Sequence, residues 1–178
     1  LGARAFARST DTDSQPYVVS DALVMVDRAT RLVMVTPVAS HSEFADCVEG
    51  WIHRYGCMRT LATDGEPANL SDAHTLLRTH YGIAFRRVNA PYHSHHNAPA
   101  ETTVHQLKRL ASTLCSDGNI APGAHWPLAL AHAEDILNVL PRTGLEGDCA
   151  LQRLHGRAPS LRYFHAFGCR AYVLAVGA

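Results

Sequence analysis

The chain has 178 residues, of which 47% are hydrophobic and 18% are charged, as is usual for a globular protein. Sixteen Lys and Arg residues balance sixteen Asp and Glu residues, which excludes the overall positive charge of many nucleic-acid-binding proteins. This length gives one domain a substantial core and leaves little room for a second, so we expect a single domain over residues 1–178.

The sequence argues against membrane insertion and against a disulfide framework. No apolar run approaches the roughly 20 residues of a membrane span, and the first residues lack the order of a signal peptide, so we expect no membrane contact. The five cysteines are widely spaced and include no CxxC pair, which fits a reducing compartment. Neither end carries a recognisable signal, and we expect the chain to be part of a longer polyprotein.

Short β-branched runs in the first quarter of the chain predict a hairpin. ALVMVD (22–27) and RLVMVTPV (31–38) are separated by RAT (28–30), which is typical of two strands and a short turn. A preceding strand is predicted over Ala5 to Thr10. Ser40 and Glu43 have the spacing of a capping box and predict a helix through about Tyr55, which Gly56 ends.

A strand–helix–strand unit is predicted next. MRTLAT (58–63) is typical of a buried strand, a helical stretch runs from Ser71 to Gly82, and AFRRV (84–88) is a further strand. Short links of this kind indicate a parallel pair crossed by the helix.

Helices and a final strand complete the predicted elements. After a Pro-rich loop (89–99), apolar residues recur at helical spacing: Val104, Leu107, Leu110, Ala111 and Leu114. Another helix covers about 125–140 and stops at Pro141, and AYVLAV (171–176) is strand-like. The order predicts an α/β domain with a five-stranded mixed sheet flanked by helices, in which the first three strands are antiparallel.

Three carboxylates fall where such a sheet brings functional groups together. Asp64 follows a predicted strand, Asp11 follows the first predicted strand, and Glu101 lies in the first turn of a helix. Two or three carboxylates on separate elements suit Mg²⁺, which prefers oxygen ligands. The structural alternative is that Glu101 stabilises the helix dipole and that Asp64 is a turn residue.

The helix that begins near Glu101 carries a polar stripe beside its apolar face. Its members follow the spacing i, i+4, i+7 and i+11: Glu101, His105, Lys108 and Ser112. A carboxylate, an imidazole and an ammonium group would therefore be presented together. If the chain binds DNA, Lys108 and His105, together with His96 and Asn97 in the preceding loop, are the candidates to contact it.

Five segments resemble the catalytic core of integrases of copia-type LTR retrotransposons, in the order and spacing of that family. They are LVMVDRATRLVMVTPV, LATDGEPANLSD, YGIAFRRVNAPYHSHHNAPAE, HWPLALAHAEDILNVLPR and CALQRLHGRAPSLRYFHAFGCRAYV. The 36 residues between Asp64 and Glu101 are close to the family's separation of its last two acids. The closing Phe-Gly-Cys, residues 167–169, is similar to the copia type, and residues 141–178 are then a C-terminal extension of the core.

The resemblance implies a ribonuclease H-like fold and a site of Asp11, Asp64 and Glu101 that holds two Mg²⁺ ions, with Mn²⁺ as a substitute. It implies processing of DNA 3′ ends and strand transfer into a target duplex. It also implies a homodimer or higher oligomer that acts in the nucleus, after assembly in retroelement particles. Asp13 is an alternative first acid.

Some residues depart from the family's pattern. Gly65 and Glu66 follow the second acid in place of Asn-Gly, and Thr102 to His105 replace Arg and Asn-Arg after Glu101. Fewer basic and amide groups beside the site weaken contacts to phosphates. Two alternatives follow: a catalytically silent or domesticated fold kept for dimerisation or tethering to DNA or chromatin, and a nuclease that acts on RNA–DNA hybrids.

Three further groups have both structural and functional interpretations. His93, His95 and His96 are either transition-metal ligands or part of a loop that flanks a DNA site, and the sequence favours the loop. We expect Asp27 and Arg28 to serve the hairpin turn. Trp51 and Trp126 are expected in the core or at a dimer contact, and not as platforms for stacked bases.

Overall fold

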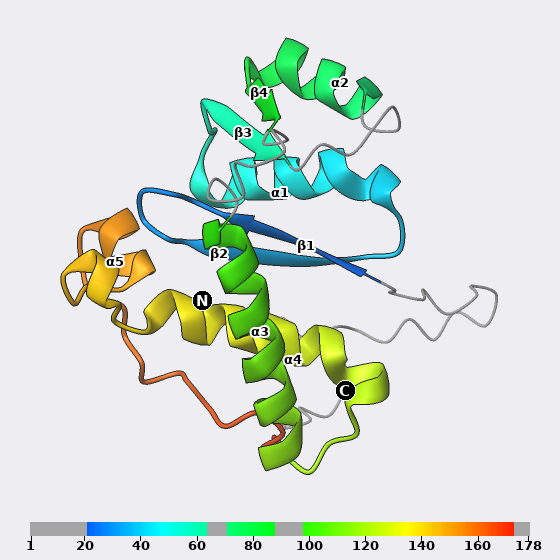
Figure 1. Ribbon diagram of the computed structural model, residues 1–178. Coiled ribbons are helices and arrows are strands. Elements are labelled where there is room, and N and C mark those ends of the chain that lie inside the picture. Colours follow the sequence, from blue (N-terminus) through cyan, green and yellow to red (C-terminus); the bar gives the residue numbers. More distant parts are fainter. Residues whose placement is uncertain (1–20, 64–70, 88–97, 173–178) are drawn as a thin grey trace, which may run out of the picture.

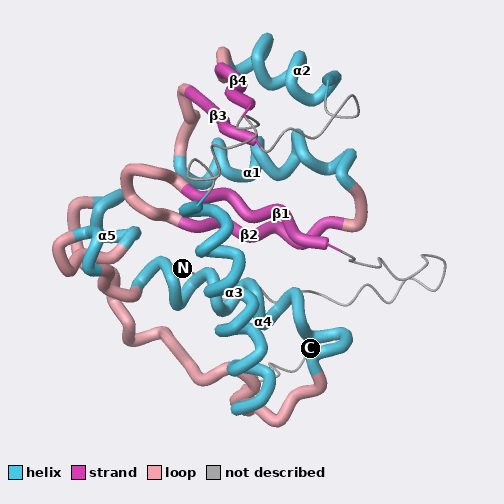
Figure 2. The backbone as a smooth tube through the Cα atoms, viewed as in Figure 1, coloured by secondary structure: helices cyan, strands magenta, loops and turns pink. Residues whose placement is uncertain are grey.

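The structure is a computed structural model that describes residues 21–63, 71–87 and 98–172 of the chain (Figure 1). In chain order it consists of a hairpin, a strand–helix–strand unit and a group of helices. Figure 2 shows the hairpin between two helical layers, with one long helix on one side and two crossing helices on the other.

The hairpin forms the middle layer. β1 (Asp21–Val26) pairs antiparallel with β2 (Val33–Val38). Side chains of a strand alternate between its two faces. Met34 accordingly packs in the cluster on the α1 side, whereas Val33 and Val35 pack among residues of α3 and α4. The predicted hairpin is therefore confirmed, and both of its faces are covered.

Helix α1 (Phe44–Tyr55) follows the hairpin through a short 3₁₀ turn. Oε1 of Glu43 accepts hydrogen bonds from the backbone N–H groups of Ala39 and Ser40 at 2.9 and 3.0 Å, as the capping-box spacing predicted. Gly56, with φ of 98°, ends the helix in a conformation that favours glycine. The buried face of α1 consists of Phe44, Cys47, Val48 and Trp51, so Trp51 is a core residue.

The strand–helix–strand unit is confirmed. β3 (Thr60–Thr63) and β4 (Ala84–Arg87) are parallel, and α2 (Ser71–Tyr81) connects them. Leu77 of α2 and Ile83 before β4 are fully buried in the same cluster as α1. Burial of these side chains holds the unit on the α1 side of the hairpin.

Two long helices cover the opposite face of the hairpin. α3 (Ala98–Asp117) and α4 (Pro122–Val139) pack against each other, and Leu107, Ala133 and Leu137 form a cluster with Val33 and Val35 of β2. The predicted apolar face of α3 is confirmed. Along it, Leu107 and Ala111 are buried, and Val104, Leu110 and Leu114 are half-buried.

Helix α4 also closes the outer edge of β2 through hydrogen bonds. Asn138 accepts from the backbone N–H of Val33 at 2.8 Å and donates to the Val33 carbonyl at 2.7 Å. Oε2 of Glu134 accepts from the backbone N–H of Val35 at 2.8 Å. Both side chains are buried, and Oε1 of Glu134 pairs with Arg54 at 3.3 Å. The two side chains thus take the place of another strand at this edge.

The last described part of the chain contains α5 (Ala150–His155), followed by residues 156–172 without helix or strand. The strand predicted over 171–176 is absent at residues 171 and 172, and its remainder lies outside the described residues. All five cysteines are described and are free thiols. Among the described residues, no helix combines the length and apolar character needed to cross a membrane.

The described strands form two separate two-stranded sheets, β1–β2 and β3–β4. The predicted first strand, Ala5 to Thr10, lies outside the described residues. The described residues therefore contain an antiparallel pair and a parallel pair of the predicted mixed sheet, and the joining of these pairs into one five-stranded sheet stays a prediction.

Replacing Asn138 with Ala should lower the free energy of unfolding by about 3 kcal/mol, because two buried backbone groups of Val33 lose their partner. Urea unfolding followed by circular dichroism measures the change as a lower midpoint with an unchanged slope. Gln106→Ala, which removes an exposed amide from α3, is the control and should change the midpoint little. Equal midpoints for the two variants would contradict this role of Asn138.

Candidate active site

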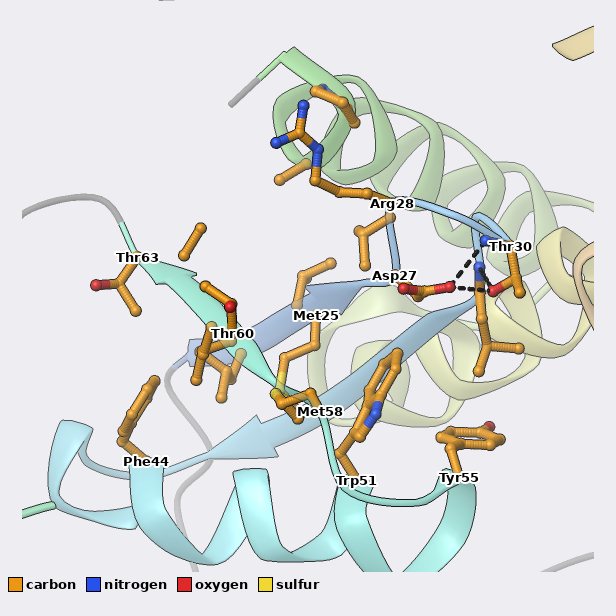
Figure 3. Close-up of a pocket in the computed structure, with 18 of the residues that line it drawn as sticks. Met25, Asp27, Arg28, Thr30, Phe44, Trp51, Tyr55, Met58, Thr60 and Thr63 are labelled. Carbon is orange, nitrogen blue, oxygen red and sulfur yellow. Dashed lines mark hydrogen bonds between the residues drawn. The ribbon is translucent and has the colours of Figure 1, made fainter. Parts of the chain in front are cut away.

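A cavity of about 750 Å³ lies between β1 and β3 (Figure 3). All residues of both strands line it, whereas a strand that presents one face contributes only alternate residues. In the described part of the chain, β1 pairs only with β2 and β3 only with β4. The second edges of β1 and β3 therefore face the cavity, and Phe44, Trp51 and Tyr55 of α1 line one side of it.

The cavity connects the two places where the sequence predicts acidic residues. Thr63, the last residue of β3, lines it, and so do Pro99 and Ala100 in the first turn of α3. Asp64 follows Thr63 directly in the chain, and Glu101 follows Ala100. The carboxyl end of a parallel strand and the start of a helix thus meet at one cavity, which is a common location for sites in α/β proteins.

Glu101 is exposed in the first turn of α3, where the helix dipole favours a negative charge. The first turn is fixed by Thr103, whose buried hydroxyl donates to the carbonyl of Pro99 at 2.7 Å. With Thr103 facing inward, the carboxylate of Glu101 faces solvent beside the lining residues Pro99 and Ala100. Such a carboxylate is available to a ligand without the cost of breaking a buried contact.

The polar stripe on α3 is confirmed. Glu101, His105, Lys108 and Ser112 are all exposed, and their spacing places them on one side of the helix. A hard oxygen ligand at the start of the helix is thus followed by an imidazole and an ammonium group. The imidazole and ammonium groups of this stripe suit a negatively charged ligand that lies along this side of α3.

Asp27 serves the hairpin turn, as predicted. Its Oδ2 accepts from the backbone N–H of Thr30 at 2.8 Å and from the Thr30 hydroxyl at 2.6 Å (Figure 3). Burial raises the pKa of the Asp27 carboxyl, but the hydrogen bonds from Thr30, Ala29 and Arg28 outweigh it, so the pKa is lowered. Asp27 is therefore an ionised structural carboxylate.

Arg28 has a role that the sequence did not indicate. It is exposed, lines the cavity and projects from the turn on the α3 side (Figure 3). A guanidinium group at this position can donate to a phosphate at the edge of the cavity. From the sequence we expected Arg28 to serve only the hairpin turn. The residues around it do not indicate that the turn lies beside α3, which is far away in the chain.

Several predicted site residues lie outside the described residues, and their placement stays a prediction. They are Asp11, Asp13, Asp64, His93, His95, His96 and Asn97. Within the described residues, no group of three or more His, Cys, Asp and Glu is arranged to hold a metal ion. Of the predicted acids, the structure thus places Glu101, and with it the DNA-contact candidates His105 and Lys108.

Comparisons with known proteins relate the chain to transposon polyproteins. No family model matches it. It is 28% identical over 193 residues to a retrovirus-related Pol polyprotein from transposon RE2 of Arabidopsis thaliana, covering 94% of the chain and 13% of that protein. It is 32% identical over 82 residues to the corresponding polyprotein from transposon RE1 of the same plant, covering 46% of the chain and 6% of that protein. The chain thus spans a small part of these relatives.

Solved structures identify the fold. The integrase catalytic core domain of HTLV-2, in complex with magnesium and in a trimeric form, matches with a TM-score of 0.61 and 24% identity, over 75% of this chain and 84% of that one. An intasome of simian T-cell lymphotropic virus with a PP2A regulatory subunit matches with a TM-score of 0.63 and 23% identity, over 87% and 53% of the two chains. The two plant relatives and these structures together confirm the resemblance to copia-type transposon polyproteins and to integrase catalytic cores, and the fold is ribonuclease H-like.

Replacing Asp27 with Asn should destabilise the protein at neutral pH and have progressively less effect in acid. A lowered pKa means that the ionised carboxyl stabilises the folded state above its ordinary pKa of about 3.9, and this contribution is lost as the pH falls through the lowered value. Urea unfolding of both proteins between pH 7 and pH 3 measures the difference.

Thr30→Val removes the hydroxyl donor and should abolish most of the effect of Asp27→Asn when the two changes are combined. Additive effects of the two substitutions, or a difference that is independent of pH, would contradict the interaction.

Proposed function

We propose that this chain, a relative of copia-type transposon polyproteins with the fold of an integrase catalytic core, performs metal-dependent 3′-end processing and DNA strand transfer. The observation that carries the proposal is the cavity that joins the end of β3 to the start of α3, next to Asp64 and Glu101. A metal-dependent polynucleotidyl transferase needs carboxylates from separate elements close together, and this cavity is where the ends of β3 and α3 that adjoin Asp64 and Glu101 meet.

A central strand would account for the shape of the cavity. We assign the slot between the edges of β1 and β3 to the strand predicted over Ala5 to Thr10, which precedes β1 in the chain. A strand parallel to β3 and antiparallel to β1 would join the two sheets into one mixed five-stranded sheet. It would end at the edge where β3 ends, so that Asp11, or Asp13 as the alternative, approaches Asp64.

The residues of the proposed site suit divalent ions. Asp11, Asp64 and Glu101 would supply only carboxylate oxygens, the ligand type that Mg²⁺ and Mn²⁺ take. When bound, two such ions would activate the attacking water or 3′-hydroxyl and stabilise the departing oxygen. The magnesium in the HTLV-2 core domain supports the choice of ion.

The chain's own groups would position the nucleic acid. Lys108 and His105, on the stripe of Glu101, and Arg28, which lines the cavity on the α3 side, carry donors for phosphate oxygens. His96 and Asn97, in the loop before α3, are proposed to contact the same DNA. The substrates would be the element's duplex ends and a target duplex, which places the activity in the nucleus.

Oligomerisation belongs to the same proposal. The HTLV-2 core domain is described in dimeric and trimeric forms, and the simian virus protein in an intasome. We therefore propose that this chain acts as a homodimer or higher oligomer, so that two element ends are held in one assembly.

Calorimetric titration with Mg²⁺ and Mn²⁺ tests the metal site. The unchanged chain should bind the ions, whereas Asp64→Asn and Glu101→Gln should lower the affinity at least tenfold, because each removes a charged ligand. The control is Asp117→Asn, which neutralises an exposed carboxylate at the other end of α3 and should bind normally. Retained binding in both site variants, or no binding by any protein, would favour the catalytically silent fold.

Activity should follow the same variants. In a strand-transfer assay with a duplex end and a plasmid target, Glu101→Gln should abolish joining without changing the urea midpoint. The control Asp117→Asn should join DNA normally. Unchanged joining by Glu101→Gln would remove Glu101 from the site, and cleavage of RNA–DNA hybrids without joining would indicate the nuclease alternative.

Proline substitution tests the central strand. Ala7→Pro, inside the predicted strand, should lower the free energy of unfolding by at least about 2 kcal/mol, because proline removes a backbone donor from the middle of a sheet. Ala3→Pro lies before the predicted strand and is the matched control. If both substitutions shift the urea midpoint equally, another segment fills the slot.

A further inference from the structure

The last part of the chain carries basic side chains and no carboxylates. Every Asp and Glu lies between Asp11 and Asp148, whereas four of the sixteen basic residues follow Asp148. Three of these four lie in residues 156–172, which we call the basic strap. In Figure 1 the basic strap runs from α5 to the far end of α3, opposite the end that carries Glu101. A chain of zero net charge thus has, after Asp148, a stretch with basic side chains and no carboxylates.

The basic strap is anchored to the helix pair by two aromatic side chains. Phe167 packs against the small buried residues Ala111, Cys115 and Ala129, which lie on α3 and α4. The rings of Phe164 and Phe167 lie 6.1 and 5.7 Å from the ring of His132 on α4. These contacts give a segment without helix or strand a fixed place on the surface.

Two tight turns present the polar residues of the basic strap. The N–H of Phe164 donates to the carbonyl of Leu161 at 2.9 Å, which leaves Arg162 and Tyr163 exposed at the tip of the first turn. The N–H of Cys169 donates to the carbonyl of Ala166 at 3.1 Å. In this second turn Gly168 has φ of 76°, a conformation that favours glycine, and a Cβ there would lie 2.6 Å from Cδ1 of Ile120, which would have to move.

The arginines of the basic strap differ from the arginine just before it. Arg153 is paired with Glu146 at 3.1 Å and with Asp148 at 2.8 Å. Within the described residues, no ion pair with a carboxylate involves the strap's exposed guanidinium groups, which belong to Arg157, Arg162 and Arg170. The guanidinium of Arg162 lies 5.1 Å from the centre of the Tyr163 ring, which leaves its edge free to donate.

We infer that the basic strap binds the sugar–phosphate backbone of duplex DNA, as a contact separate from the Glu101 site. Guanidinium groups bind phosphate oxygens in pairs of hydrogen bonds, and among the described residues none of the strap's three guanidinium groups is engaged in an ion pair. The 20 residues of α3 span about 30 Å, so a duplex of roughly ten base pairs is needed to reach from one site to the other. The inference rests on the proposed DNA substrate but requires no metal.

Fluorescence anisotropy with a labelled 30-base-pair duplex, in EDTA and over a range of salt concentrations, tests the contact. Arg162→Gln with Arg170→Gln should weaken binding roughly tenfold and reduce the slope of log affinity against log salt by about two. The control, Arg59→Gln with Arg78→Gln, makes the same change in net charge on the exposed β3 and α2 side and should change both quantities little. Equal losses in the two variants, or no loss in the strap variant, would overturn the inference.

A third variant tests whether the strap must be anchored. Phe167→Ala removes no charge but detaches the second turn from α3 and α4, so it should weaken DNA binding while the urea midpoint confirms that the protein stays folded. Unchanged affinity in a folded Phe167→Ala protein would contradict a fixed contact surface.

The proposal of the metal site and the proposal of DNA binding by the basic strap can be contradicted separately. Glu101→Gln should bind the duplex normally in EDTA even though it joins no DNA. If no variant affects metal binding but the strap variant loses DNA affinity, the inference about the strap stands and the proposed catalytic function falls.

Discussion

The hydrogen bonds between α4 and the outer edge of β2 hold the layers of the domain in register. Asn138 and Glu134 bind the backbone of Val33 and Val35, and Glu134 also pairs with Arg54 of α1. These bonds end the sheet at β2 without leaving an exposed edge and join α4 to both faces of the hairpin. Because α3 packs against α4, these hydrogen bonds also help to fix the position of the first turn of α3. That turn carries Glu101, so the same bonds influence where Glu101 lies relative to the cavity.

The cavity between β1 and β3 separates the two sheets that the structure describes. Buried strand edges without partners are costly, and we therefore propose that another segment of the chain pairs with these two edges. In the proposed arrangement, a strand between these edges would also bring its terminal acid to the end of β3. Carboxylates placed together in this way would repel one another in the absence of cations, so metal binding would be coupled to the order of the proposed site.

Helix α3 connects the two parts of the surface that the proposals concern. Its first turn carries Glu101 beside the cavity, and its last turns receive Phe167 of the basic strap. A helix of this length is a rigid spacer, so the separation between the two sites is constant. A duplex bound along the strap is thereby presented at a defined distance from the proposed catalytic carboxylates.

The sequence alone determined the elements that depend on neighbouring residues. Alternating apolar residues specified the hairpin, Ser40, Glu43 and Gly56 specified the bounds of α1, and helical spacing specified the stripe and the buried face of α3, because caps and periodicity act within a few residues. Only the tertiary structure decided that Asn138 binds Val33 across 105 residues, that Arg28 stands beside α3, and that two strand edges share a cavity. Those features depend on contacts between segments far apart in the chain, which no local pattern encodes.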